Sequence, residues 1–336
     1  MQFMEQGVTA MRQLAPGVLV AVLVSLAAEF IVQTYGGPIL LLALLLGMAF
    51  HFLSEDPRLA SGLEFCTRFV LRLGVALLGA RITFEQIATL GLRPVVIVIA
   101  GVTTTMLASR ALARRLGLGD SFAALSGTAV SICGVSAALT VAAVLPQRPE
   151  LGRQTVVVCI AVTALSTIAM LLYPPLATLA RFSAVEGGVF LGATIHDVAQ
   201  VVGAGYSMSG RHGDVATFTK LLRVLLLAPL VLTLAALVAR RTHDAGRTRL
   251  AQLAPPWFLT AFVIIVTLNS LHVLPAPLVR GAVESSQLCL VLAIAALGLR
   301  TSLATLQEVG WRPLALMVAQ TGLLALVVAA LLALTG

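Results

Sequence analysis

The chain has 336 residues, of which 59% are hydrophobic and only 11% are charged. A soluble domain carries about 25% charged residues, so this composition excludes an ordinary soluble protein and indicates a polytopic membrane protein. The net charge of +8 comes mostly from basic residues between apolar runs, where they set orientation and meet lipid headgroups, so we expect no nucleic-acid partner.

About 20 consecutive apolar residues cross the hydrocarbon core of a bilayer. The first apolar run lacks the features of a cleaved signal and is expected to be a span. The sequence therefore predicts an all-α polytopic membrane protein, treated as a single transmembrane transporter domain over residues 1–336. Its about eleven expected spans are 16–33, 37–53, 62–80, 93–109, 121–146, 153–173, 185–206, 214–238, 255–273, 277–298 and 314–335.

Two basic loops indicate the orientation of these spans. Residues 110–120 carry three arginines, and residues 239–253 carry four. Positive loops stay on the cytoplasmic side, and the four predicted spans between them allow both loops to lie there. We therefore expect the N-terminus inside the cell and the C-terminus outside.

A charged series in the third expected span has helical spacing. Glu64 and Arg68 are four residues apart and are predicted to form an ion pair. Arg72 follows one turn deeper and is interpreted as a buried structural cation, with a place on an anion path as the alternative.

A 17-residue segment that begins at Leu78 recurs from Leu297 at a constant offset of 219 residues. Six positions are identical: Leu78, Gly79, Arg81, Gly91, Arg93 and Pro94 match Leu297, Gly298, Arg300, Gly310, Arg312 and Pro313. Seven predicted spans separate the copies, so the copies face opposite ways. Inverted repeats are typical of secondary transporters, although a shared way of ending one helix and starting the next is the alternative.

The repeat-like halves cover residues 37–109 and 255–335, and the central motif helices between them cover residues 121–206. In the fifth span, small and hydroxyl residues replace bulky ones at Gly127, Thr128, Ser131, Gly134 and Ser136. A break here would expose backbone N–H groups at the start of a second half-helix, which form an anion site. Close helix packing through small residues is the competing interpretation.

The seventh span carries its polar residues near the middle: Thr194, His196, Asp197 and Gln200. An ionisable residue at that depth is costly, so it is a functional candidate by default, and glycines on both sides allow a second broken helix. Asp197 is predicted to bind a proton or Na⁺ or to orient His196, which could pair with an anion when protonated. A tightly packed helix with a satisfied polar cluster is the alternative.

In the eighth span, Lys220 and Arg223 are three residues apart and share a helix face. On the expected topology they lie near the outer end, where they would draw anions towards a pore; snorkelling to the headgroups is the alternative. The four cysteines form no C-x-x-C pair and the five histidines have no ligand spacing, so we expect neither a metal nor a cofactor.

These motifs are where the chain resembles a known family. It is similar to the YeiH-like bacterial inner-membrane proteins, a family named for sulfate export, over nearly its whole length. The matching segments are S-G-T-A-V-S-I-C-G-V-S-A-A at 126–138, G-A-T-I-H-D-V-A-Q-V-V-G-A-G at 192–205 and K-L-L-R-V-L-L-L-A-P at 220–229. The resemblance implies a multi-pass protein of the bacterial inner (plasma) membrane that exports an anion.

The main hypothesis is a secondary active transporter that exports a small inorganic oxyanion such as sulfate or sulfite. The fifth-span residues named above would contact the anion, and His196 and Asp197 would couple its movement to H⁺ or Na⁺.

The alternative is a cation/proton antiporter that exchanges ions at Asp197. A sensor or scaffold is disfavoured because no soluble signalling domain is present. An enzyme is disfavoured because no nucleotide loop, metal cluster or catalytic triad is present. The lipid bilayer is an expected partner, and a homodimer is compatible with the sequence.

Overall fold

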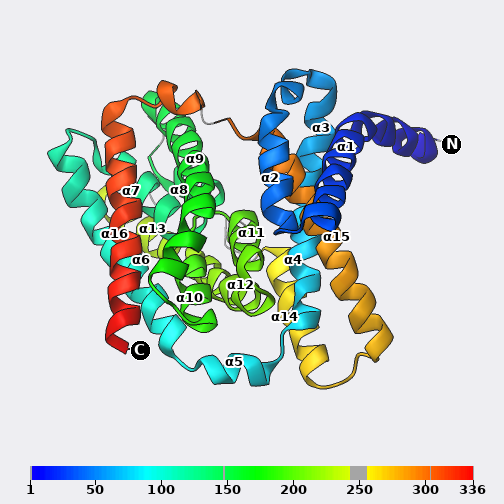
Figure 1. Ribbon diagram of the computed structural model, residues 1–336. Coiled ribbons are helices and arrows are strands. Elements are labelled where there is room, and N and C mark those ends of the chain that lie inside the picture. The colour runs from blue at the N-terminus through cyan, green and yellow to red at the C-terminus, as the bar shows by residue number, and fades with distance from the viewer. Residues whose placement is uncertain (1, 147, 243–255, 303, 336) are drawn as a thin grey trace. The chain divides into compact units, whose positions relative to one another are not determined.

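The computed structural model describes residues 2–146, 148–242, 256–302 and 304–335, and every regular element in these ranges is a helix (Figure 1). Six helices in the described ranges are long and apolar enough to cross a membrane: Arg12–Tyr35, Arg93–Arg115, Pro149–Leu179, Gly210–Leu234, Ala276–Arg300 and Trp311–Thr335. Shorter helices occupy the other expected spans. The prediction of an all-α polytopic membrane protein is confirmed.

The chain forms two compact units. The prediction of one transmembrane domain over residues 1–336 did not include this division. Unit 1 comprises Met1–Thr89, Tyr206–Met208 and Pro256–Ser302. Unit 2 comprises Leu90–Gly205, Ser209–Pro255 and Leu303–Gly336.

Unit 1 is built around one long helix, α15, against which α2, α4 and α1 pack. Asp56 is the N-cap of α3, which packs against α1. Its carboxylate accepts a hydrogen bond from the Arg58 backbone N–H at 2.9 Å, which satisfies one of the free donors of the first turn. The helices that carry the unit are α1 (Gln2–Tyr35), α2 (Ile39–Ala49), η1 (His51–Glu55), α3 (Pro57–Phe65), η2 (Cys66–Val70), α4 (Leu71–Leu77), η3 (Leu78–Arg81), α5 (Phe84–Leu90), α14 (Trp257–Ser270) and α15 (Ala276–Arg300).

The charged series of the third expected span lies along the surface of unit 1. The predicted ion pair is confirmed, with 2.8 Å between Arg68 Nη1 and Glu64 Oε1. The interpretation of Arg72 as a buried cation is wrong: its side chain is exposed, and its guanidinium carbon lies 5.9 Å from the ring centroid of Phe258. The interpretation rested on how far along the span Arg72 lies. Burial depends instead on which face of the helix a residue occupies, and Arg72 is on the exposed face.

The contact between α2 and α15 depends on two glycines. A Cβ atom placed on Gly298 would lie 2.3 Å from the Leu44 carbonyl oxygen and 2.9 Å from Gly47 Cα. Both neighbours are backbone atoms of a packed helix and cannot rotate away.

Gly298→Ala is therefore expected to destabilise the protein by about 1–3 kcal/mol through overpacking. The matched control is Gly281→Ala on the same helix, where a Cβ meets no atom within 4 Å. Alanine there should be neutral or stabilising by up to about 1 kcal/mol, because it has the higher helix propensity. Thermal unfolding of the purified variants in detergent measures both, and equal midpoints for the two variants would contradict the close packing.

Unit 2 contains the central motif helices. Its closest helix pairs are α10 with α12 and α6 with α16. Its elements are α6 (Arg93–Arg115), α7 (Asp120–Thr128), η4 (Ala129–Cys133), α8 (Val135–Val144), α9 (Pro149–Leu179), α10 (Ala184–Thr194), α11 (Val198–Met208, whose last three residues belong to unit 1), α12 (Gly210–Leu225), α13 (Leu227–Thr242), η6 (Ala304–Glu308) and α16 (Trp311–Thr335).

Both predicted breaks in the central helices are present. The fifth span is interrupted at Gly134, whose φ of 64° and ψ of −126° lie in a region essentially open to glycine alone. The seventh span is interrupted between Thr194 and Val198, where Ile195 and Asp197 are extended. Each span thus consists of two half-helices, α7–η4 with α8, and α10 with α11.

Candidate functional site

The two breaks cross each other inside unit 2. A Cβ atom on Gly134 would lie 3.8 Å from the His196 carbonyl oxygen. We call residues 130–136 and 192–200 together the crossing. His196 links it to α16 and is fully buried: Nδ1 donates to the Val130 carbonyl at 2.9 Å, and Nε2 accepts from the Thr321 hydroxyl at 3.0 Å. A carbonyl can only accept, so the proton of the neutral ring lies on Nδ1.

Lys220 on α12 reaches into the crossing and is fully buried. Its ammonium group donates to the carbonyl oxygens of Ile132 at 2.6 Å and of Ile195 at 3.0 Å, and also to that of His196. These three bonds use all three protons of the ammonium group. Lys220 therefore joins the end of η4 to the end of α10.

Arg223 lies one turn later on the same face and is also fully buried. Its Nε donates to the Ser131 carbonyl at 2.9 Å, and Nη2 donates to that of Val130 at 2.8 Å. Its Nη1 donates to the carbonyls of Ile195 at 2.8 Å and Gly192 at 3.1 Å. The guanidinium thus bridges the same two half-helices as Lys220.

Both cations supply hydrogen-bond donors to the backbone carbonyls that the breaks leave without a partner within their helices. The last carbonyls of a helix have no partner within that helix and carry about half a negative charge together. In a membrane such groups must find donors inside the protein. The prediction that Lys220 lies near the outer end of its span is thus replaced: it is at the crossing, and its protons point to backbone carbonyls.

The starts of the second half-helices differ from each other. At α11, Asp197 caps the helix by accepting from the Ala199 backbone N–H at 2.8 Å. The backbone N–H groups of His196 and Asp197 both donate to the Ser166 hydroxyl, at 3.2 Å and 3.0 Å. Asp197 as a whole residue is partly exposed.

At α8, the residue before the helix is Gly134, and no side chain of the described residues caps the first turn. Ser136 in that turn is exposed, and its hydroxyl donates to the Cys133 carbonyl at 3.2 Å. The crossing therefore has a buried side, where cations meet carbonyls. We call the two helix starts, one capped with partly exposed Asp197 and one uncapped with exposed Ser136, its accessible side.

Comparison with known proteins places the chain in a family. The profile described as "Conserved hypothetical protein 698" matches residues 13–317. The chain belongs to this family. It is 49% identical to a UPF0324 membrane protein of Chlorobaculum tepidum, over 93% of this chain and 87% of that protein. It is 48% identical to the UPF0324 membrane protein TauZ of Paracoccus pantotrophus, over 96% of this chain and 95% of TauZ.

The resemblance to YeiH-like proteins is confirmed as well. The UPF0324 inner membrane protein YeiH of Escherichia coli K12 is 36% identical over 75% of this chain and 72% of YeiH. No solved structure matches the chain. The family membership and the spanning helices together identify a multi-pass membrane protein.

Three of the predicted site residues are engaged by neighbouring atoms of the protein rather than open to an anion. A Cβ atom on Gly127 would lie 2.5 Å from the Ser109 hydroxyl oxygen, so Gly127 allows α7 to approach α6. The hydroxyls of Thr128 and Thr194 donate to carbonyls of their own helices, at 2.8 Å and 2.6 Å. Their role as anion contacts stays a prediction, which would require these hydroxyls to turn away from their present partners.

Two other predicted residues are buried with an oxygen that has no partner among the described residues. These atoms are Ser131 Oγ and Gln200 Oε1. The amide nitrogen of Gln200 donates to the Thr167 hydroxyl at 2.7 Å, which ties α11 to α9. Of the predicted set, the structure thus brings eight residues to the crossing: Ser131, Gly134, Ser136, Thr194, His196, Asp197, Gln200 and Lys220.

Several polar residues of unit 2 were not foreseen from the sequence. Ser166 and Thr167 on α9 and Thr321 on α16 hold the crossing in place, as described above. Gln320, next to Thr321, donates to the hydroxyls of Ser109 and Ser126, both at 3.0 Å. Each is a polar residue inside an apolar span, which is the signal that could have identified them.

Proposed function

We propose that this protein is a secondary active transporter that exports a small inorganic oxyanion, such as sulfate or sulfite, coupled to H⁺ or Na⁺. The observation that carries the proposal is the uncapped start of α8 on the accessible side of the crossing. The N-terminus of a helix carries about half a positive charge and directs free N–H groups outward. Ser136 in the same turn is exposed, and its hydroxyl would add a neutral donor on turning from the Cys133 carbonyl towards an anion.

The charge of the crossing favours an anion over a cation. Lys220 and Arg223 contribute two positive charges, and Asp197 contributes one negative charge when ionised. Two helix starts and two helix ends contribute about +0.5 and −0.5 each and cancel. The crossing therefore carries about one net positive charge, which attracts an anion strongly where the dielectric constant is low.

The cation/proton antiporter remains the second candidate because of one observation. Asp197 is a partly exposed residue at the start of a half-helix, and in the antiporter its carboxylate would exchange a proton or Na⁺. In the anion transporter, the same carboxylate is the coupling group. A second carboxylate at the crossing, which would favour the antiporter, is not found among the described residues.

We further propose eleven spans built around an inverted repeat, and contacts in unit 1 support it. A Cβ atom on Gly298 would lie 2.9 Å from Gly47 Cα, and one on Gly79 would lie 3.3 Å from Val266 Cγ2. The repeat offset relates Gly79 to Gly298 and Gly47 to Val266. The two copies thus pack against each other through equivalent positions.

Contacts in unit 2 also agree with the repeat. Arg93, at the start of α6, donates to the Leu332 carbonyl near the end of α16 at 2.7 Å. Arg312, its counterpart at the start of α16, lies with Nη1 3.7 Å from a Cβ atom placed on Gly117, just after α6. This reciprocal pattern requires antiparallel helices, as inverted copies do.

Because the relative YeiH is named an inner membrane protein, we place this chain in the bacterial inner membrane, with its N-terminus in the cytoplasm.

The test is transport of radiolabelled sulfate and sulfite by the purified protein in proteoliposomes, with and without a pH gradient. We expect flux of at least one oxyanion, and we expect Ser136→Ala to weaken the apparent affinity about 10-fold or more, because a hydrogen bond to a charged group is lost. The control is Thr140→Ala, one turn later, where the hydroxyl donates only to its own helix at the Ser136 carbonyl. Absence of flux for every oxyanion would refute the transporter.

A further inference from the structure

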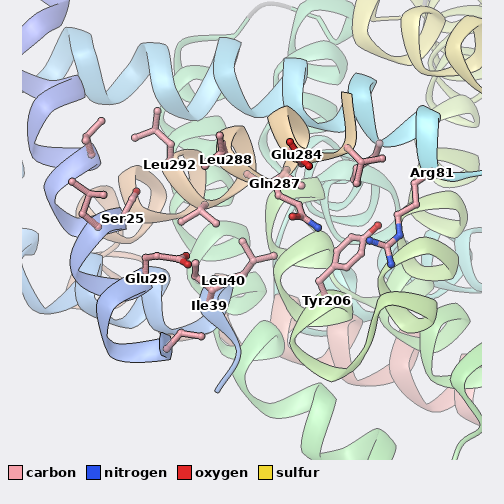
Figure 2. A pocket seen from close by; sticks show the side chains of 17 residues that line it. Ser25, Glu29, Ile39, Leu40, Arg81, Tyr206, Glu284, Gln287, Leu288 and Leu292 are labelled. Atoms are coloured by element: carbon pink, nitrogen blue, oxygen red, sulfur yellow. The ribbon is translucent and has the colours of Figure 1, made fainter. Parts of the chain in front are cut away.

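Unit 1 contains a cavity that the proposed transport does not use. It has a volume of about 870 Å³ and lies among α1, α2, η3 and α15, with Tyr206 at one side (Figure 2). This volume falls within the range of about 300–1,000 Å³ that is usual for small-molecule sites. Most of its walls are apolar, from residues such as Leu26, Leu40 and Leu288.

Charged side chains stand at intervals among these apolar walls. Glu29 projects from α1, and Glu284 projects from α15 on the other wall (Figure 2). Glu29 accepts a hydrogen bond from the Gln33 amide at 3.0 Å, and Glu284 has no hydrogen bond or ion pair within the described ranges. Arg81 lies on the far side, with its guanidinium carbon 5.4 Å from the ring centroid of Tyr206.

Placing the two ionised glutamates inside membrane-spanning helices costs free energy. Both α1 and α15 are long and apolar enough to cross a membrane, and both glutamate side chains are exposed on unit 1. A carboxylate inside a span requires a partner or a water-filled space, because hydrocarbon does not solvate its charge. The cavity thus offers two carboxylates that a positively charged group would stabilise, beside a surface that would hold a hydrocarbon chain.

We propose that this cavity binds an aminophospholipid, such as phosphatidylethanolamine, from the surrounding bilayer. The ammonium group of the lipid lies between Glu29 and Glu284, and an acyl chain lies along the apolar wall formed by α1, α2 and α15. The charge of Arg81 attracts the phosphate. Two carboxylates against one guanidinium leave the lining net negative, so it selects a zwitterionic lipid with an exposed amine over an anionic lipid.

The experiment is native mass spectrometry of the full-length protein in detergent, titrated with palmitoyl-oleoyl phosphatidylethanolamine or with the phosphatidylglycerol of the same chains. We expect retention of the ethanolamine lipid at a concentration about fivefold lower than the glycerol lipid. The double variant Glu29→Gln and Glu284→Gln should weaken binding of the ethanolamine lipid about fivefold, as expected for the loss of a modest ion pair, and leave the glycerol lipid unaffected. Leu288→Trp, an exposed lining position, should weaken binding of both lipids by filling the cavity.

The matched controls are Glu55→Gln and Glu85→Gln, exposed carboxylates of unit 1 outside the cavity, which should leave both affinities unchanged. Equal affinity for the two lipids, or an equal loss in the control variants, would overturn the proposal. A dimer that dissociates in the Glu29 and Glu284 double variant would overturn it as well, because the cavity would then be covered by a second copy of the chain.

Discussion

Replacement of Lys220 by methionine should destabilise the protein by about 3–5 kcal/mol, the usual consequence of removing one side of a buried charged contact. Lys220 is fully buried, and its three protons bind carbonyls at the ends of η4 and α10. Methionine fills a similar volume but donates no hydrogen bond, so these carbonyls would be buried without partners. Arg223→Met should have an effect of similar size for the same reason.

Thermal unfolding in detergent, followed by size-exclusion chromatography, measures this loss. The control is Arg211→Met, which removes an exposed positive charge from the first turn of the same helix. Arg211→Met should change the unfolding midpoint little, because exposed charges contribute about 0–1 kcal/mol. If Lys220→Met is no less stable than Arg211→Met, the two cations do not hold the half-helices together.

Asp197→Asn is expected to retain the fold and to abolish coupling. Asparagine is as good an N-cap as aspartate, so the bond to the Ala199 N–H should persist and stability should change by less than about 1 kcal/mol. The amide cannot take up a proton or balance Na⁺. Oxyanion flux in proteoliposomes should therefore become independent of the pH gradient, while flux down the gradient of the anion itself continues.

The control for this substitution is Asp56→Asn, a second aspartate that caps a helix, α3, but lies in the exposed part of unit 1. It should leave the dependence on pH unchanged. Loss of Na⁺-dependent proton movement in Asp197→Asn, with anion binding intact, would instead favour the cation/proton antiporter. Anion flux in Asp197→Asn that still responds to the pH gradient would remove Asp197 from the coupling mechanism.

The sequence located both breaks because each has a local cause. Gly134 adopts a backbone conformation that other residues avoid. Thr194, His196 and Asp197 place polar side chains in an otherwise apolar helix, where threonine and aspartate compete for backbone hydrogen bonds. The pairing of Glu64 with Arg68 was predictable for the same reason, because residues four apart on a helix are neighbours.

The role of Lys220 was not predictable in this way. Its expected place near the outer end of its span suggested a group that attracts ions, but its partners lie 88, 25 and 24 residues away along the chain. No local pattern specifies which carbonyls a long side chain will reach. The same holds for Ser166 and Thr321, which meet His196 and its neighbours only after α9 and α16 have packed.

By itself, the sequence determined the class of protein, its helices and the two places where helices stop, because hydropathy and backbone preference act over a few neighbouring residues. Only the tertiary structure decided that the two breaks cross, that Lys220 and Arg223 satisfy the helix ends there, and that α8 begins without a cap. Those features depend on which distant segments meet, and that is set by the packing of whole helices.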